Sequence, residues 1–162
     1  MRRSVAYCVA TAFVAASGAA HAATATTSFQ VQLTIQAQCL INSASTLNFG
    51  TQGVLSANVD QTSAIQVQCT STTPYNIGLD AGTGAGATVT TRKLTGGGAT
   101  INYTLYWDSA RSTVWGNTIG TDTVAATGTG ASANFTVYGR IPAQSTPAPG
   151  TYTDTITVTV TY

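Results

Sequence analysis

The feature that most constrains this chain is its final stretch, residues 152–162, in which threonine occupies every second position and, from Ile156 on, apolar side chains occupy the positions between. Successive side chains of a strand point to opposite faces, so this pattern predicts a β-strand with one apolar and one hydroxyl face. The apolar face carries Ile156, Val158, Val160 and Tyr162. The stretch runs to the last residue, and a long apolar strand at a sheet edge is a template for pairing. We therefore expect its neighbour to be either an earlier strand or a strand from another molecule.

Residues 1–22 have the pattern of a secretory signal peptide, which we exclude from the fold. They combine a positively charged start, an apolar run over residues 5–16 and an A-x-A-like motif that predicts cleavage between Ala22 and Ala23. The apolar run is shorter than the roughly 20 residues that a membrane-spanning helix needs. The exported chain is then residues 23–162, which is the length of one ordinary domain.

The exported chain is poor in the side chains that catalysis and nucleic-acid binding use. It contains no histidine and no glutamate, so the usual general bases and nucleophile pairs are missing. Its few basic residues form no cluster that would indicate a nucleic-acid partner. We expect a protein that is not an enzyme, with no catalytic residues, no cofactor and no metal site. The basic residues are Arg92, Lys93, Arg111 and Arg140, against aspartates 60, 80, 108, 122 and 154.

Two cysteines, Cys39 and Cys69, remain once Cys8 leaves with the signal segment. In an exported chain this pair predicts one disulfide, which we favour over two buried free thiols or a metal site. On the chain-entropy model, closing a loop of this length stabilises the fold by roughly 3–4 kcal/mol.

A second strict alternation occupies residues 29–37, with Phe29, Val31, Leu33 and Ile35 on one parity. It is either an ordinary first strand or a strand that is donated to another molecule. Further strands are expected at residues 46–50, 63–70, 75–79, 88–94, 101–107 and 134–141, with a turn at 42–45 and no helix. This pattern favours an antiparallel β-sandwich of Greek-key type over a membrane barrel, whose spanning segments would all be about 9–11 residues long.

Four aromatic residues, Tyr103, Tyr106, Trp107 and Trp115, lie close together in the sequence. They are either a platform on which sugars stack or part of the core. Core packing is favoured, because alternate residues of a strand over 101–107 must face inward.

These motifs together resemble the spore coat protein U domain, the subunit domain of archaic (Csu-type) chaperone–usher pili. The resemblance covers nearly all of the exported chain, and its final block is the most specific. Besides the alternating strand before Cys39, the matching segments are Leu47-Asn-Phe-Gly50, Ile65-Gln-Val-Gln-Cys69-Thr, Pro74-Tyr-Asn-Ile-Gly-Leu-Asp-Ala-Gly82, Tyr103-x-Leu-Tyr106, Trp115-Gly116, Gly128-Thr-Gly130, Val137-Tyr-Gly-Arg-Ile-Pro142 and the stretch from Pro149 to Tyr162.

The resemblance implies an incomplete immunoglobulin-like β-sandwich that lacks its last strand and is completed by donor-strand complementation. Residues 23–36 would form the donor extension and residues 37–162 the pilin domain. Donor residues would be Phe29, Val31, Leu33 and Ile35, and acceptor-groove residues Ile156, Val158, Val160 and Tyr162. The Cys39–Cys69 bridge matches the family's disulfide.

The resemblance also implies a location and partners. The subunit would pass through the periplasm, bound to a dedicated chaperone, and an outer-membrane usher would add it to neighbouring subunits in a surface pilus that supports adhesion and biofilm formation. The alternative is a secreted, monomeric β-sandwich binding module for carbohydrate or a surface ligand. In that alternative, residues 29–37 would pair within their own fold.

Overall fold

The computed structural model of the chain describes residues 21–162, so the predicted signal segment lies almost entirely outside the described residues. The chain divides into two units, Met1–Thr34 and Ile35–Tyr162, which are described separately. In the first unit, the described residues 21–34 carry no secondary structure and are exposed. Every strand of the described residues belongs to the second unit.

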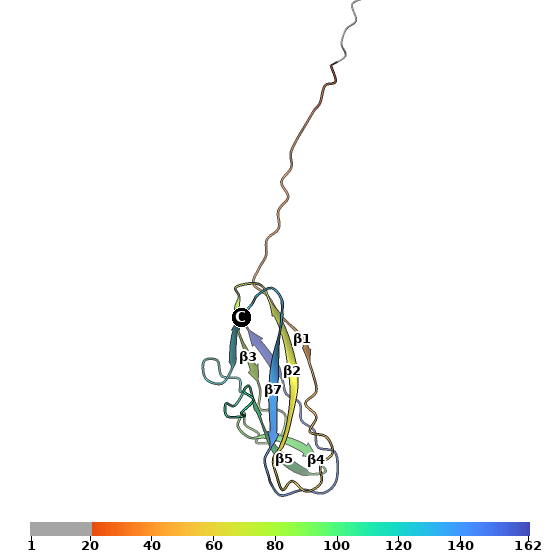
Figure 1. Ribbon diagram of the computed structural model, residues 1–162, viewed down its shortest axis with the longest axis vertical. Coiled ribbons are helices and arrows are strands. Elements are labelled where there is room, and N and C mark those ends of the chain that lie inside the picture. The colour runs from red at the N-terminus through yellow and green to blue at the C-terminus, as the bar shows by residue number, and fades with distance from the viewer. Residues whose placement is uncertain (1–20) are drawn as a thin grey trace, which may run out of the picture. The chain divides into compact units, whose positions relative to one another are not determined.

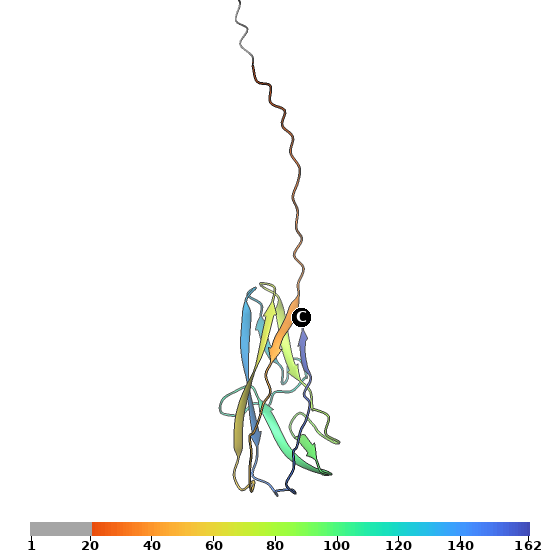
Figure 2. The same ribbon diagram turned by 90° about the vertical axis from the view of Figure 1, so that its right-hand side faces the viewer.

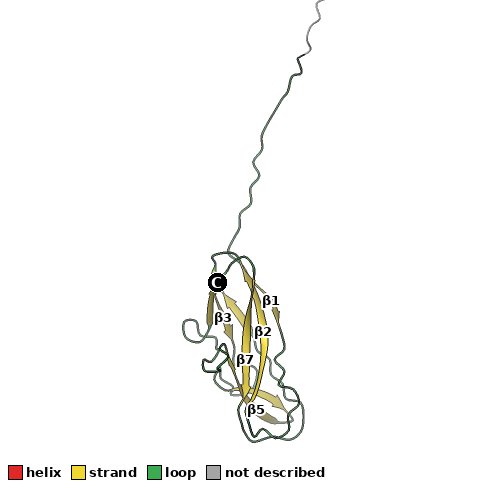
Figure 3. Ribbon diagram, in the orientation of Figure 1, coloured by secondary structure: helices red, strands yellow, loops and turns green. Residues whose placement is uncertain are grey.

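The second unit consists of two antiparallel sheets, and residues 21–162 contain no helix (Figures 1 and 3). The five-stranded sheet has the order β1 (Cys39–Ala44), β2 (Val59–Cys69), β7 (Ser132–Ile141), β5 (Ala99–Tyr106) and β4 (Arg92–Gly96). The three-stranded sheet has the order β6 (Val124–Thr127), β3 (Pro74–Leu79) and β8 (Val158–Thr161). The predicted all-β sandwich is confirmed.

The ends of several strands meet at one pole of the domain, the upper end in Figure 2, which we name the exit pole. The start of β1 pairs with the end of β2 at Cys39 and Cys69, and the end of β2 lies beside the start of β7. The end of β8 pairs with the start of β3 through Thr161 and Asn76. The chain therefore enters β1 and completes β8 at the same pole.

The core lies between the sheets and follows the period of two that the sequence shows. In β2, Ile65 and Val67 are buried while Ala64 on the opposite parity is exposed. The same alternation buries Tyr75, Ile77 and Leu79 in β3, although the small Gly78 between them is enclosed as well. The rest of the core comprises Cys39, Phe49, Leu55, Cys69, Tyr103, Leu105, Trp115, Val137 and Ile141.

Several local elements were predicted wrongly or missed, and the strand expected at residues 88–94 is a turn at 89–90 followed by β4. The expected strand at residues 46–50 is a loop, in which Phe49 is buried against Tyr103 with ring centroids 6.2 Å apart. The expected turn at residues 42–45 instead continues β1 to Ala44 through an irregularity between Ile41 and Ser43. Strand β6, only four residues long and rich in alanine, was not predicted.

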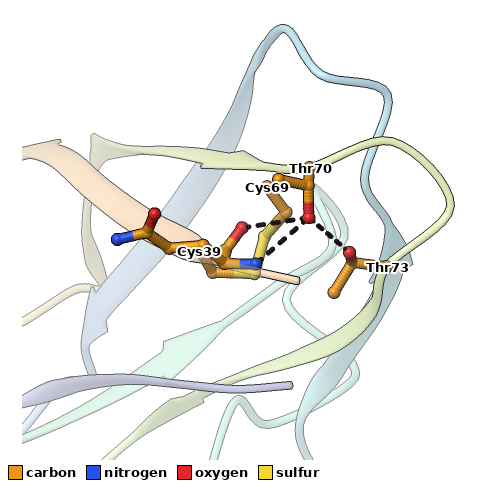
Figure 4. The surroundings of a disulfide bond; sticks show 5 residues. Cys39, Cys69, Thr70 and Thr73 are labelled. Atoms are coloured by element: carbon orange, nitrogen blue, oxygen red, sulfur yellow. Dashed lines mark hydrogen bonds between the residues drawn. A yellow bond between two sulfur atoms is a disulfide. The ribbon is translucent and has the colours of Figure 1, made fainter. Parts of the chain in front are cut away.

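The predicted disulfide between Cys39 and Cys69 is confirmed, with a Cα–Cα distance of 4.1 Å (Figure 4). It joins the first residue of β1 to the last residue of β2 at the exit pole. Because β1 is an edge strand with β2 as its sheet neighbour, the bridge supplements the backbone bonds that hold it.

Replacing both cysteines, Cys39→Ala with Cys69→Ala, should lower the free energy of unfolding by about 2–4 kcal/mol, because the unfolded chain regains the freedom of the closed loop. Urea unfolding of the exported chain measures this loss. The wild-type protein under reducing conditions is the control and should match the variant. Equal stability of oxidised and reduced wild type would contradict a stabilising role for the bridge.

Candidate functional site at the open edge of β8

Strand β8 lies at the end of the three-stranded sheet and pairs with β3, from Thr161 opposite Asn76 to Val158 opposite Leu79. No other strand in the described part of the chain is paired with its second edge. An unpaired edge presents backbone N–H and C=O groups that another strand can bind. The edge is therefore a candidate site for strand addition.

Alternate side chains along this edge face the core without being sealed from solvent. Ile156, Val158 and Val160 are half-buried and pack against the core, whereas Tyr162 is 59% exposed. The alternation predicted for residues 152–162 is thus present, although only residues 158–161 form a regular ladder. The incomplete burial leaves apolar surface at the edge, and covering such surface is favourable by about 25 cal/mol per Å².

The four predicted donor residues differ from the half-buried edge residues, because their side chains are exposed to solvent. The exposed fractions are 87% for Phe29, 83% for Val31, 82% for Leu33 and 71% for Ile35. Large apolar side chains rarely stand exposed as a contiguous series unless a partner covers them. Both the donor and the acceptor assignments therefore remain predictions.

A carboxylate holds the segment that leads into β8. The Asp80 side chain accepts hydrogen bonds from the backbone N–H groups of Thr157, at 2.9 Å, and Gly82, at 3.0 Å. The Asp80 N–H in turn donates to the Thr157 carbonyl at 3.2 Å. Burial raises the pKa of Asp80, but the bonds from Thr157 and Gly82 outweigh it, so the pKa is lowered overall. The charged form of Asp80 therefore secures Thr157.

A second carboxylate secures the same segment three residues earlier. Asp154 accepts hydrogen bonds from the Tyr103 hydroxyl at 2.8 Å and from the Thr83 N–H and hydroxyl at 2.8 and 2.9 Å. Burial, followed by the bond to Asp154, raises the pKa of Tyr103, so its hydroxyl stays protonated and donates. Backbone bonds between Thr95 and Thr153 in both directions add a third attachment.

Arg92 lies beside these contacts and donates to the Asp80 carbonyl, and its side chain is fully buried. Its guanidinium donates to the carbonyls of Leu79, Asp80, Val89 and Trp115 at 2.7–3.0 Å. Burial lowers the pKa of Arg92, yet arginine stays charged in proteins, and these carbonyls replace the water it loses. The sequence indicated none of this, because the acceptors come from segments far apart in the chain.

The aromatic residues do not form an exposed stacking platform. Tyr103 and Trp115 are buried, and the Trp115 indole N–H donates to the Ile77 carbonyl at 2.8 Å. Tyr106 is half-buried, and Trp107 is 46% exposed. The structure therefore agrees with the core-packing interpretation for Tyr103 and Trp115.

Among residues 21–162, no group of three or more His, Cys, Asp or Glu side chains could hold a metal ion. The same residues include no helix with the length and hydropathy that crossing a bilayer requires.

Comparison with known proteins identifies the family. The family model for the Spore Coat Protein U domain matches residues 25–159. The chain belongs to the Spore Coat Protein U domain family. Protein U of Myxococcus xanthus is 34% identical over 177 aligned positions, which cover 100% of this chain and 98% of that protein. This membership agrees with the resemblance inferred from the motifs.

A solved structure shares the fold of this Spore Coat Protein U domain. It is a chain of the CsuC–CsuE chaperone–tip adhesion subunit pre-assembly complex from the archaic chaperone-usher Csu pili of Acinetobacter baumannii. The TM-score is 0.60 at 22% identity, and the match covers 80% of this chain and 41% of the other. The family is structural and non-enzymatic, so the expectation that this chain is not an enzyme is confirmed.

The substitution Asp80→Asn tests the contact at the start of the β8 edge. The lowered pKa means that the carboxylate stabilises the fold above its unfolded-state pKa of about 4, and this contribution is lost as pH falls through the folded-state pKa. We expect the variant to lose about 1–3 kcal/mol of unfolding free energy at neutral pH and to depend less on pH below about 4. Urea unfolding at several pH values measures both effects.

Asp108→Asn is the matched control. Hydrogen bonds from Ser112, and then from Thr113, lower the pKa of Asp108 to about 2, so this variant should also flatten the acid limb of the stability curve. Asp108 makes these bonds within its own loop, and none of them involves the β8 segment. Only Asp80→Asn should speed hydrogen exchange at the Thr157 amide, and equal exchange in the two variants would contradict the role given to Asp80.

Proposed function

We propose that this protein is a structural pilus subunit that polymerises by donor-strand exchange. One observation carries the proposal: the chain has both an open sheet edge and an exposed apolar series of matching length. The series runs from Phe29 to Ile35, and the apolar face of the edge runs from Ile156 to Tyr162, each with four residues at spacing two. If residues 29–35 of one molecule add as a strand to the β8 edge of the next, the exposed apolar side chains are covered and the open edge is paired.

The energetics support this pairing. Burying four large apolar side chains contributes roughly 1.5–3 kcal/mol each, or about 6–12 kcal/mol before the costs of ordering. The free energy of unfolding of a typical domain is about 5–15 kcal/mol. The free energy gained by burying the donor side chains would therefore be comparable to that of the whole fold. Contact between different surfaces of successive copies is head-to-tail, and such contacts form open filaments when the rotation does not close.

The family and the fold support a specific assembly pathway, the chaperone–usher pathway. The solved structure with the same fold comes from a chaperone–subunit complex of chaperone-usher pili. We infer that a periplasmic chaperone covers the β8 edge after export and signal cleavage at Ala22–Ala23. An outer-membrane usher then exchanges the chaperone's strand for residues 29–35 of the next subunit. The product is a pilus at the cell surface, serving adhesion and biofilm formation.

The substitution Leu33→Asp in the exported chain, residues 23–162, tests the proposal. It places a charge in the middle of the donor series, where burial without a partner is costly. Wild type should form ladders of polymers that resist denaturant on unheated gels and elute early in gel filtration. Leu33→Asp should form at least about tenfold fewer, because 1.4 kcal/mol already corresponds to a factor of ten.

Gln32→Asp is the matched control, since residue 32 has the parity opposite to the donor residues. It should polymerise like wild type. A wild type that stays a stable monomer at every concentration would contradict the proposal and favour a secreted binding module. Equal loss in both variants would contradict the assignment of Leu33 to the buried face.

A further inference from the structure

The point where the donor segment leaves the domain is held rigidly. The Gln38 N–H donates to the Thr70 hydroxyl at 3.1 Å, and the Thr70 N–H donates to the Gln38 carbonyl at 2.9 Å. The next residue, Cys39, is fixed by the disulfide, and the Thr70 and Thr73 hydroxyls lie 2.6 Å apart (Figure 4). The chain is thus fastened to the exit pole from Gln38 onward.

Only Gln36 and Ala37 separate this fastened residue from Ile35, the last predicted donor residue. A fully extended chain spans at most about 3.6 Å per residue, so the Cα atoms of Ile35 and Gln38 can be no more than about 11 Å apart. A molecule that binds Ile35 at its β8 edge therefore lies close to the exit pole of the donor as well.

The exit pole has a surface suited to such contact. A hollow of about 360 Å³ opens there, and Leu40 on its rim is 52% exposed. The residues that line it carry no charge and include Ile35, Gln38, Leu40, Thr70, Ser71 and Gly130. Depletion of charged residues is typical of the core of a protein–protein contact.

We propose that the exit pole is a second subunit contact, which docks onto the segment Thr151–Thr155 of the next copy. The inference rests on the proposed function and adds a surface that strand exchange alone does not require. It predicts that each junction is a strand-exchange joint stiffened by a surface contact, rather than two domains on a flexible tether.

The strand direction selects this segment as the partner. All strand pairs of the domain are antiparallel, and β8 ends at the exit pole. A parallel donor would bring the exit pole of one copy onto the exit pole of the next, where the acceptor's own donor segment departs. An antiparallel donor, with the two apolar series matched end to end, places Ile35 beside Ile156 and Gln38 near Thr153.

The segment Thr151–Thr155 offers an exposed, uncharged surface with a fixed backbone. The threonine side chains at 151, 153 and 155 are exposed. The single charge, Asp154, is turned toward Tyr103 and Thr83, and the backbone of Thr153 is bonded to Thr95. The surface offered to the exit pole is therefore uncharged and held in place, which limits the entropy lost on docking.

The test compares polymers of the exported chain that carry Ser71→Arg, Thr153→Arg or Thr62→Arg. The last is the control, because Thr62 is exposed in the middle of β2, away from both surfaces. Ser71→Arg and Thr153→Arg should shorten the lifetime of junctions in denaturant at least tenfold, while Thr62→Arg leaves it unchanged. Combining Ser71→Arg with Thr153→Asp should restore the lifetime, because opposite charges then face each other.

A spacer variant provides a second measurement. Four Gly/Ser residues inserted after Gln36 leave the donor residues intact but release the exit pole, so polymers should form with shortened junction lifetimes. Junction lifetimes equal to wild type in Ser71→Arg, Thr153→Arg and the spacer variant would overturn this inference alone. A wild type that forms no polymer would overturn the proposed function, and the second contact with it.

Discussion

The structure depends on how β8 is held, because this strand has β3 as its sheet neighbour and only four residues in the ladder. A short edge strand with one neighbour is marginal when it relies on backbone bonds alone. The segment before it compensates through side chains, since Asp80 binds the Thr157 amide and Asp154 binds the Tyr103 hydroxyl. These contacts leave the second edge of β8 open while keeping the strand in position to receive a partner.

The distribution of charge fits an assembling protein. The chain has very few charged residues, and those beside the β8 segment are used inside the domain. Arg92 is buried among carbonyls, and Asp80 accepts backbone amides, so neither presents a free charge at the edge. Desolvating a charge is the main cost of burying polar surface, and the surfaces that would meet in a polymer avoid that cost.

Much of the fold follows from periodicity, and what does not follow depends on tertiary context. The alternation in residues 63–70 and 134–141 predicts strands correctly, because both find a partner in their own sheets. Residues 29–37 alternate just as strictly but form no strand here, since a strand requires a neighbour as well as a propensity. Residues 46–50 form a loop that buries Phe49 but pairs with no strand. Apolar content alone therefore does not distinguish a buried loop from a strand. The edge residues Ile156, Val158 and Val160 could be predicted from the pattern, whereas the roles of Arg92 and Asp154 could not, because their partners are distant in sequence.

Hydrogen exchange at the backbone of β8 tests the central claim most directly. In the exported chain, the β8 amides that do not bond to β3 should be protected at least about 100-fold more in polymers than in dissociated monomers. The amides of residues 29–35 should gain protection in the same step, because both strands enter one ladder. Unchanged exchange at β8 while residues 29–35 become protected elsewhere, or unchanged exchange at both, would contradict the account.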